Sequence, residues 1–316
     1  MTDAIHDGAD AVTAFEDAIK AAGLTPPKQV VADGRLHRFA PNGNPKDDAG
    51  YYVLHMDGAV PAGAFGDWRS GVQQSWSAKS RREMTPDERR AYKRQVAEQR
   101  RQRDEDDRQR KAAARERAQS IWARAKPAAS DHPYLQTKGV PALSGLRQDG
   151  DRLVVKVHDG KTLHSLQFID PQGEKKFLKD GAKSGCYCGF GKPVDVIVVA
   201  EGYATAASIR VATEQPVAVA FDSGNLPDVA QALQKKLPNA LILIAGDHDS
   251  HGKGQAKSQE AAAAVGGQAI VPAHEGDDWN DVHLRDGVEA VRGAFEAAIY
   301  GRGPDQGDDR GEVPPP

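Results

Sequence analysis

Apolar runs alternate regularly with segments of helical periodicity over the last third of the chain. Four apolar runs, "VDVIVVA", "PVAVAF", "ALILIAG" and "QAIVPA", are each followed by a segment with helical periodicity. Runs that are apolar throughout are typical of strands buried on both faces, and the helices between them provide the crossovers that parallel strands need. Residues 194–300 are therefore predicted to form an α/β domain with a doubly wound, Rossmann-like parallel sheet of about four strands.

The upstream part of the chain has a different pattern, in which short strands are separated by Gly, Pro and Asn turns. Residues 10–22 have helical periodicity, and four short strand patterns follow them. Residues 127–193 begin with the capped turn "DHPYLQTKGV" and continue with the alternation typical of antiparallel strands. We therefore predict a small α+β domain over residues 1–78 and a second strand-rich piece over residues 127–193.

Between these pieces, residues 79–126 have helical signals but almost no apolar stripe. Thr85 supplies an N-cap, Pro86 takes the first helical position and Asp87 falls in the first turn. The segment holds 17 Lys and Arg against 9 Asp and Glu, although the whole chain has a net charge of −3. A long charged helix of this kind is either a solvated linker laced with ion pairs or a surface for nucleic acid, and both interpretations stay open.

Composition narrows the class of protein. The chain has 316 residues, of which 39% are hydrophobic, enough for two domains with real cores. Its two cysteines, Cys186 and Cys188, exclude a disulfide framework, and no CxxC pairs stand at zinc-finger spacing. No secretory leader or membrane-spanning run is recognisable, so we expect a cytoplasmic protein without a membrane partner. The Gly- and Pro-rich residues 301–316 are predicted to form a disordered tail.

Acidic residues follow each of the four predicted strands. They are Glu201, Asp222, Asp247, Asp249, Asp277, Asp278 and Asp281. Because the carboxyl ends of parallel strands meet at one edge of a sheet, these carboxylates should converge there. They would repel one another unless a divalent cation, Mg²⁺ or Mn²⁺, lay among them. The alternate acids Asp247 and Asp249 are the strongest candidates for metal ligands.

Structural roles compete with metal binding at several of these positions. A single Asp after a strand is usually a helix cap, which is the preferred interpretation of Asp222. Asp278 and Asp281 fit either a metal shell or the start of a helix in "DDWNDVHL". No histidine pair has HxH or HExxH spacing, which argues against zinc. Lys253 and Lys257 either reach a triphosphate or face the solvent.

Aromatic residues gather in the predicted N-terminal domain, where arginines lie between them. The aromatic positions are Tyr51, Tyr52, Phe65, Trp68 and Trp76. Aromatic side chains beside Arg38 and Arg69 suit the stacking of unpaired bases. In a small sheet, however, most of them are expected in the core, so base contact and core packing both stay open.

The hexapeptide "EGYATA" beginning at Glu201, followed by "DHD" beginning at Asp247, resembles the signature of Toprim domains in primases of satellite phages and conjugative plasmids. The resemblance covers residues 194–300, and "GAFGDWRSG" is similar to N-terminal parts of mobile-element primases. It implies a Toprim domain with a catalytic core like that of DnaG-type primases. Thr205 stands where cellular DnaG-type primases usually carry an Asp, which fits the phage and plasmid branch.

The resemblance implies a DNA primase, which synthesises short RNA primers on single-stranded DNA from ribonucleoside triphosphates by two-metal phosphoryl transfer, for plasmid, phage or mobile-element replication. The implied catalytic residues are Glu201, Asp247 and Asp249, with Glu201 either a metal ligand or a general base. The implied metal ligands are Glu201, Asp247, Asp249, Asp278 and Asp281. The predicted phosphate contacts are Gly202, Lys253 and Lys257. The predicted nucleic-acid contacts are Arg38, Trp68, Arg69, Arg81, Arg82, Arg89 and Arg90.

Two competing functions stay open. Toprim domains also occur in metal-dependent nucleases, and the chain could instead be a catalytically silent accessory protein that binds nucleic acid. A topoisomerase is not expected, because it needs a tyrosine nucleophile in a further large domain. The sequence has no P-loop of the GxxxxGK[ST] kind, so a replicative helicase would be a separate partner, which the sequence does not identify.

Overall fold

The computed structural model of the chain describes three stretches of residues: 3–58, 60–80 and 82–301. Side chains are described from Asp10 onward. Two predictions fall outside these stretches, namely Arg81 as a nucleic-acid contact and, apart from Gly301, the disordered tail. In the described stretches no helix is long and apolar enough to cross a membrane.

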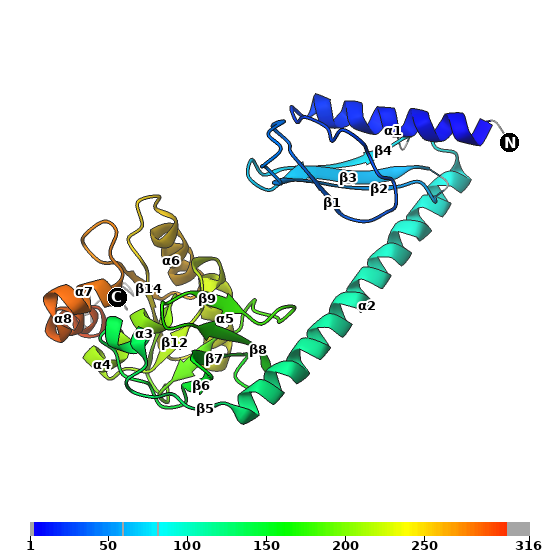
Figure 1. Cartoon of the computed structure of the whole chain (residues 1–316). Helices are drawn as coiled ribbons and strands as arrows, with labels where there is room; N and C mark the ends of the chain where they lie inside the picture. Colours follow the sequence, from blue (N-terminus) through cyan, green and yellow to red (C-terminus); the bar gives the residue numbers. More distant parts are fainter. Residues whose placement is uncertain (1–2, 59, 81, 302–316) are drawn as a thin grey trace, which may run out of the picture. The chain divides into compact units, whose positions relative to one another are not determined.

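The chain divides into two units, and the first, residues 1–106, is built on a four-stranded antiparallel sheet whose strands pair in chain order (Figure 1). Its helix and strands are α1 (Asp3–Ala21), β1 (His37–Phe39), β2 (Gly50–His55), β3 (Ala62–Asp67) and β4 (Val72–Ser77). Phe15 of α1 packs on Tyr52 and Phe65 of the sheet, with ring centroids 6.0 and 5.7 Å apart. The predicted helix and strands are confirmed, and Tyr52 and Phe65 are core residues.

The charged segment forms one 39-residue helix, α2 (Pro86–Arg124), and the division between the two units falls within it. Its start is a capping box, because Thr85 Oγ1 accepts the Glu88 N–H at 3.2 Å and the Glu88 carboxylate accepts the Thr85 N–H at 2.7 Å. Ion pairs between residues three or four apart run along it, such as Glu98 with Arg101 at 2.8 Å. The predicted charged helix is confirmed.

The second unit, residues 107–316, contains an antiparallel sheet in the order β5-β6-β7-β8-β9. Its elements are β5 (Lys126–Pro127), α3 (Pro133–Thr137), β6 (Arg147–Asp149), β7 (Arg152–His158), β8 (Leu163–Ile169) and β9 (Lys175–Phe177). The alternating sequence pattern therefore predicted β7, β8 and β9 correctly, whereas it did not single out the short strands β5 and β6.

The central sheet of the second unit has the order β10-β12-β11-β13-β14. Its strands and the helices that join or follow them are β10 (Cys188–Phe190), β11 (Val196–Ala200), α4 (Tyr203–Thr213), β12 (Val217–Val219), η1 (Ser223–Asn225), α5 (Leu226–Lys236), β13 (Leu241–Ala245), α6 (Lys253–Ala264), β14 (Gln268–Ile270), α7 (Trp279–Asp286) and α8 (Val288–Tyr300). Four strands are parallel, as predicted. The fifth, β10, precedes the predicted domain and pairs antiparallel with β12, whose outer edge it covers.

Helices cover both faces of the central sheet. Alternate residues of its strands point to opposite sides, so each face packs against its own set of helices. Ile197 and Val199 pack with residues of α5 and α6, whereas Val198 and Ala200 pack with residues of α4 and α8. The second cluster also includes Val155 of β7, so the two sheets of the second unit share one core. The doubly wound α/β architecture is therefore confirmed, and β9 lies in the same packed body as the central sheet.

Candidate active site

The two middle strands of the central sheet bring two carboxylates together. β11 and β13 run parallel, with Ala200 beside Ala245. Glu201 follows the first strand directly, and Asp247 follows the second after Gly246. Both strands are apolar and largely buried, and the first acids after them lie at their carboxyl ends. This is the edge where open α/β sheets bind their ligands.

Asp247 is the most perturbed acid of this edge. Burial raises the pKa of its carboxyl group from 3.8 to about 7, and repulsion from Glu201 and Asp278 adds to the rise. Its Oδ1 atom is buried and, in the described part of the chain, has no hydrogen-bond partner. A carboxylate held in this way is costly in the absence of a proton or a cation, which is common at sites that act chemically.

Glu201 is perturbed in the same direction. Burial raises the pKa of its carboxyl group, and repulsion from Asp222 adds to the rise. The positive charges of Lys175 and Lys253 and a hydrogen bond from the Ser223 backbone act in the opposite direction. This environment suits either a metal ligand or a general base.

Asp249 has a different environment, although it lies only two residues beyond Asp247. Its carboxylate accepts backbone N–H groups of Gly254 at 2.5 Å, Lys253 at 3.0 Å and His251 at 3.0 Å, which lowers its pKa. These bonds satisfy amide groups at the start of α6. The Gly254 backbone lies close to the backbone of Asp247. An ideal Cβ on Gly254 would lie 2.6 Å from the Asp247 carbonyl oxygen, so only glycine fits. Asp249 therefore has a structural role, whatever its role toward a metal.

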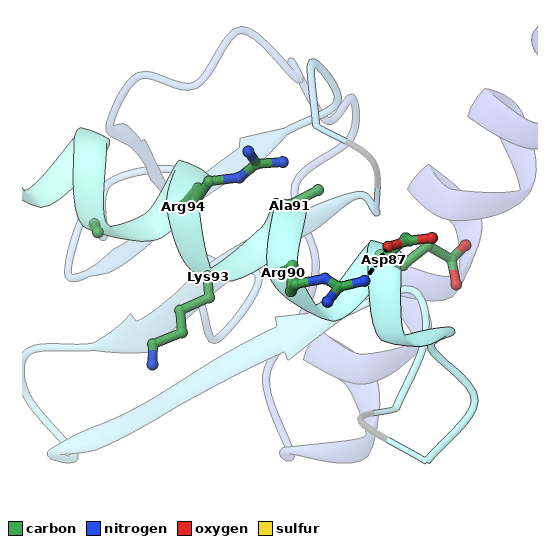
Figure 2. A pocket seen from close by; sticks show the side chains of 7 residues that line it. Asp87, Arg90, Ala91, Lys93 and Arg94 are labelled. Carbon is green, nitrogen blue, oxygen red and sulfur yellow. Dashed lines mark hydrogen bonds and ion pairs between the residues drawn. The ribbon is translucent and has the colours of Figure 1, made fainter.

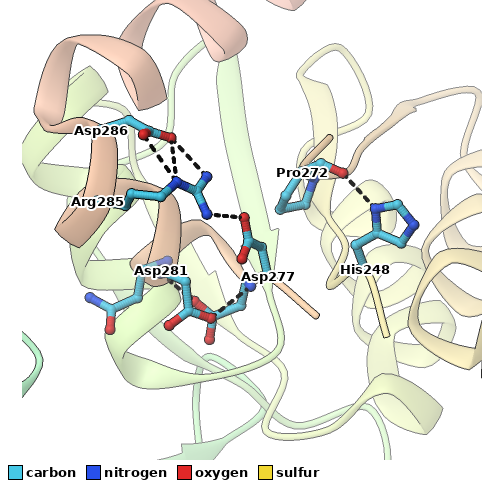
Figure 3. Close-up of polar contacts among 8 residues, drawn as sticks. His248, Pro272, Asp277, Asp281, Arg285 and Asp286 are labelled. Atoms are coloured by element: carbon cyan, nitrogen blue, oxygen red, sulfur yellow. Dashed lines mark hydrogen bonds and ion pairs between the residues drawn. The ribbon is translucent and has the colours of Figure 1, made fainter. Parts of the chain in front are cut away.

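The segment before α7 lies beside the "DHD" turn. His248 N donates to the Asp277 carbonyl at 2.9 Å, and Gly276 N donates to the His248 carbonyl at 2.6 Å. The His248 ring adds a third contact from Nδ1 to the Pro272 carbonyl at 2.9 Å (Figure 3). Since a carbonyl only accepts, Nδ1 carries the hydrogen. These contacts explain why the charge of Asp278 reaches Asp247.

Asp278 and Asp281 form the capping box of α7. Asp278 Oδ1 accepts the Asn280 and Asp281 N–H groups at 2.6 and 3.0 Å, and Asp281 Oδ2 accepts the Asp278 N–H at 3.0 Å. Helix capping is thus confirmed at both positions, while metal binding stays a prediction. The neighbouring Asp277 is paired with Arg285 at 2.6 Å (Figure 3).

Asp222 is also a cap, as preferred from the sequence. Its Oδ1 atom accepts the Asn225 N–H at 3.1 Å at the start of η1. The carboxylate also forms an ion pair with Lys183. Its negative charge is therefore partly neutralised, unlike that of Asp247.

Lys175 is a cation near both perturbed acids that the sequence alone did not single out. It is on β9, and its charge lowers the pKa of Glu201 and of Asp247. An ideal Cβ on Gly202, the N-cap residue of α4, would lie 3.4 Å from Lys175 Nζ. The lysine-rich run "EKKFLKDGAK" was a usable signal, but it is in another sheet.

The other two predicted lysines differ from each other. Lys253 is exposed at the start of α6 and its charge reaches Glu201. Lys257 forms an ion pair with Glu260 at 2.5 Å one turn later. Contact with a phosphate remains a prediction for both, and the first is better placed for it.

The donor set of this edge fits a hard divalent cation. Oxygen ligands are what Mg²⁺ prefers, and it is usually held by one or two carboxylates together with waters and substrate phosphates. The unpartnered Oδ1 of Asp247 and the repulsion between Asp247 and Glu201 are what such an ion would relieve. Among the described residues, no three His, Cys, Asp or Glu side chains form a ready-made metal cage. The fit is therefore to an ion that shares its shell with substrate.

Three predicted nucleic-acid contacts lie at the start of α2. Arg82 is exposed, Arg89 donates from Nε to the Met84 carbonyl at 3.1 Å, and Arg90 pairs with Asp87 at 2.5 Å. Figure 2 shows the hollow here, which is lined by α2 residues alone, with Arg90 reaching toward Asp87 while Lys93 and Arg94 extend in other directions. None of the acids at the carboxyl edge of the central sheet lines it, so it adds nothing to the candidate active site.

Comparison with known families identifies the acid-bearing part of the chain. Residues 196–289 match the family model described as "Toprim domain". These residues form a Toprim domain. The match begins with β11 and ends in α8, so it includes Glu201, Asp247 and Asp249.

Relatives extend the similarity beyond the Toprim domain. Two proteins of Escherichia coli, both named DNA primase TraC, are 33% identical over 279 residues and 36% identical over 282 residues. Each alignment covers 82% of this chain but only 19% and 26% of the relative, so the chain spans about a fifth to a quarter of their length. The chain is homologous to these proteins over most of its own length.

Solved primase structures are similar at a lower level. A structure of the DnaG primase catalytic domain bound to ssDNA shares 12% identity, with coverage of 60% of this chain and 80% of that one and a TM-score of 0.44. The primase fragment of the bacteriophage T7 primase-helicase protein shares 17% identity, with coverage of 52% and 69% and a TM-score of 0.38.

Proposed function

We propose that the chain is a DNA primase that synthesises short RNA primers on single-stranded DNA from ribonucleoside triphosphates. The observation that carries the proposal is the pair of half-buried, mutually repelling carboxylates, Glu201 and Asp247, at the carboxyl edge of a Toprim domain homologous to named primases. The proposed setting is the replication of a plasmid, phage or other mobile element in the cytoplasm, and the relatives named as DNA primases support the primase part of this proposal.

Each residue of the edge has a proposed task. Asp247 and Glu201 would hold Mg²⁺ or Mn²⁺, with Asp249 and Asp278 nearby, and the ion would neutralise phosphate charge and activate the attacking hydroxyl. Glu201 is the alternative acceptor for the proton of the primer 3′-hydroxyl, since its raised pKa suits a base. Lys175 and Lys253 would bind the triphosphate and orient its α-phosphate toward that hydroxyl.

The deciding experiment is a primer-synthesis assay with labelled ribonucleotides on single-stranded DNA, with Mg²⁺ or Mn²⁺. Wild type should give short products and Asp247→Asn none. The matched control is Asp195→Asn, because Asp195 is an exposed acid before the same strand β11, at its opposite end. Products from the control and not from Asp247→Asn would assign the chemistry to this edge.

Two other outcomes would overturn the proposal. Degradation of the template instead of synthesis would make the chain a Toprim nuclease. Retained binding of single-stranded DNA without synthesis or cleavage would make it an accessory protein.

A further inference from the structure

One tryptophan of the first unit is left in the solvent. Trp68, the residue after β3, is 63% exposed, while Tyr51 beneath it is 8% exposed. The two rings have centroids 4.4 Å apart and an interplanar angle of 30°. In contrast, Trp76 packs on Phe15 with centroids 5.2 Å apart. The Tyr51 ring therefore supports the Trp68 ring, most of which is open to the solvent.

The support beneath Trp68 is specific. An ideal Cβ on Gly66 would lie 2.6 Å from Tyr51 Oη and 2.3 Å from the Val72 carbonyl oxygen. Any side chain at this position would therefore displace the Tyr51 ring. Glycine at residue 66 lets that ring lie flat across the sheet and back the indole of Trp68.

The turn that carries Trp68 is braced on both sides. Asp67 accepts the backbone N–H groups of Arg69 at 3.0 Å and Ser70 at 3.2 Å, and Trp68 N donates to the Ala49 carbonyl at 3.0 Å. The Arg69 guanidinium binds the buried Asp47 carboxylate with two hydrogen bonds, at 2.7 and 2.9 Å. Arg69 thus holds the turn in place, and its charge is neutralised by Asp47.

Arg38 lies over the exposed ring, at the outer limit of a cation–π contact. Its Cζ atom is 5.9 Å from the centroid of Trp68, and Nη1 donates to the Asp48 carbonyl at 3.2 Å. This contact leaves the other donors of the guanidinium available to a phosphate. A rigid aromatic face beside an arginine is the combination that binds unpaired bases in single-stranded nucleic acids.

From these contacts we infer that the exposed ring of Trp68 stacks on an unpaired base of single-stranded DNA, with Arg38 at the adjacent phosphate. The choice of nucleic acid as the partner rests on the proposed primase function, while the site lies in the first unit and takes no part in the chemistry. We name Trp68, Tyr51 and Arg38 the stacking platform. Arg69 is a positioning residue of this platform, because it acts through the turn.

The charges around the stacking platform predict how its binding depends on salt. Asp47, Asp48 and Asp67 lie on or next to the turn, so the acids there offset Arg38 and Arg69. Stacking rather than phosphate charge must therefore provide most of the binding. Stacking depends little on salt, whereas binding through phosphate contacts falls steeply as salt rises.

The test measures binding of a fluorescent oligo(dT) to the full chain by anisotropy, without nucleotides or metal, at two salt concentrations. Trp68→Ala should weaken binding by about 5- to 150-fold, by the same factor at both. Trp68→Phe should keep most of the affinity. Tyr300→Ala is the matched control, because Tyr300 is 71% exposed but lies on α8 of the other unit, and it should bind as wild type.

Intrinsic fluorescence ties the effect to this ring. Oligo(dT) should quench the wild-type tryptophan emission, and the quench should be lost in Trp68→Phe although binding persists. Because binding is read without catalysis, a primase-inactive chain can still pass this test. An unchanged affinity of Trp68→Ala would overturn the inference and leave the platform as a surface for a protein partner. A loss that disappears at high salt would overturn it too, since charge would then carry the binding.

Discussion

The carboxyl edge of the central sheet and the helix α2 are both rich in charge, but they hold it in opposite ways. At the edge, Asp247 is half-buried and repelled by Glu201, and among the described residues its buried Oδ1 atom has no hydrogen-bond partner. On α2, acids and bases are exposed and pair with residues three or four positions away. Exposed ion pairs change the free energy of unfolding little, whereas a carboxylate with a buried and unpaired oxygen lowers it. The contrast teaches that the cost of a charge, rather than the density of charges, indicates where chemistry takes place.

The largest expected effect separates the edge from the rest of the protein. Asp247→Asn and Glu201→Gln should each lower the rate of primer synthesis by on the order of 10³-fold or more, since each removes a charge at the reacting centre. Circular dichroism should show an unchanged fold for both. A variant that kept more than about a tenth of the activity would remove that residue from the site.

The second prediction concerns the effect of the Asp247 carboxylate on the free energy of unfolding. Its pKa is raised by folding from 3.8 to about 7. Between these values the folded chain keeps a proton that the unfolded chain has lost, so metal-free wild type should lose stability as pH rises from about 4 to about 7. Asp247→Asn removes this loss and should be more stable than wild type at pH 8, by about 4 kcal/mol.

Urea unfolding in EDTA at pH 4, 6 and 8 measures that difference. The advantage of Asp247→Asn should grow over this range, and Mg²⁺ should stabilise wild type more than the variant. Asp195→Asn, exposed at the other end of the strand, should show no such trend. A constant difference at all three pH values would mean that the carboxyl group is not strained.

Asp249 should respond with the opposite sign. Its carboxylate accepts three amide N–H groups at the start of α6, and this bonding lowers its pKa. Asp249→Ala should therefore lower the stability at pH 7, as the loss of a helix cap does. The same urea series measures it, and a gain in stability would show that these bonds are not worth their desolvation.

The sequence predicted the central sheet well, because strands buried on both faces must be apolar throughout and must alternate with helices. It placed β10 in the strand-rich piece over residues 127–193, but it could not predict that this short strand joins the central sheet, since three residues of an edge strand do not indicate their partner. The lysine-rich run that contains Lys175 is visible in the sequence, but its place near the acids depends on tertiary packing of β9 and could not be predicted. Asp247 and Asp249 looked equivalent in "DHD", but burial and repulsion from Glu201 perturb the first, whereas backbone N–H groups at the start of α6 bond the second.

The smallest expected effect concerns the exposed charges of α2. Arg90 is exposed and paired with Asp87, so Arg90→Gln should change the free energy of unfolding by less than about 0.5 kcal/mol. If α2 contacts DNA, the variant should bind oligo(dT) more weakly at low salt. The slope of log affinity against log salt should then fall by about 0.7, the value for one phosphate contact on a single strand.

The comparison with Arg101→Gln decides between the two interpretations of α2. Arg101 is on the same helix and is paired in the same way, with Glu98 at 2.8 Å, but it is not among the predicted contacts. A fall in slope for Arg90→Gln alone would place a defined phosphate contact near the start of α2, because a general attraction to the helix would lower both slopes equally. Unchanged slopes in both variants would make α2 a solvated linker, and its charge would then serve the solubility of the helix rather than binding.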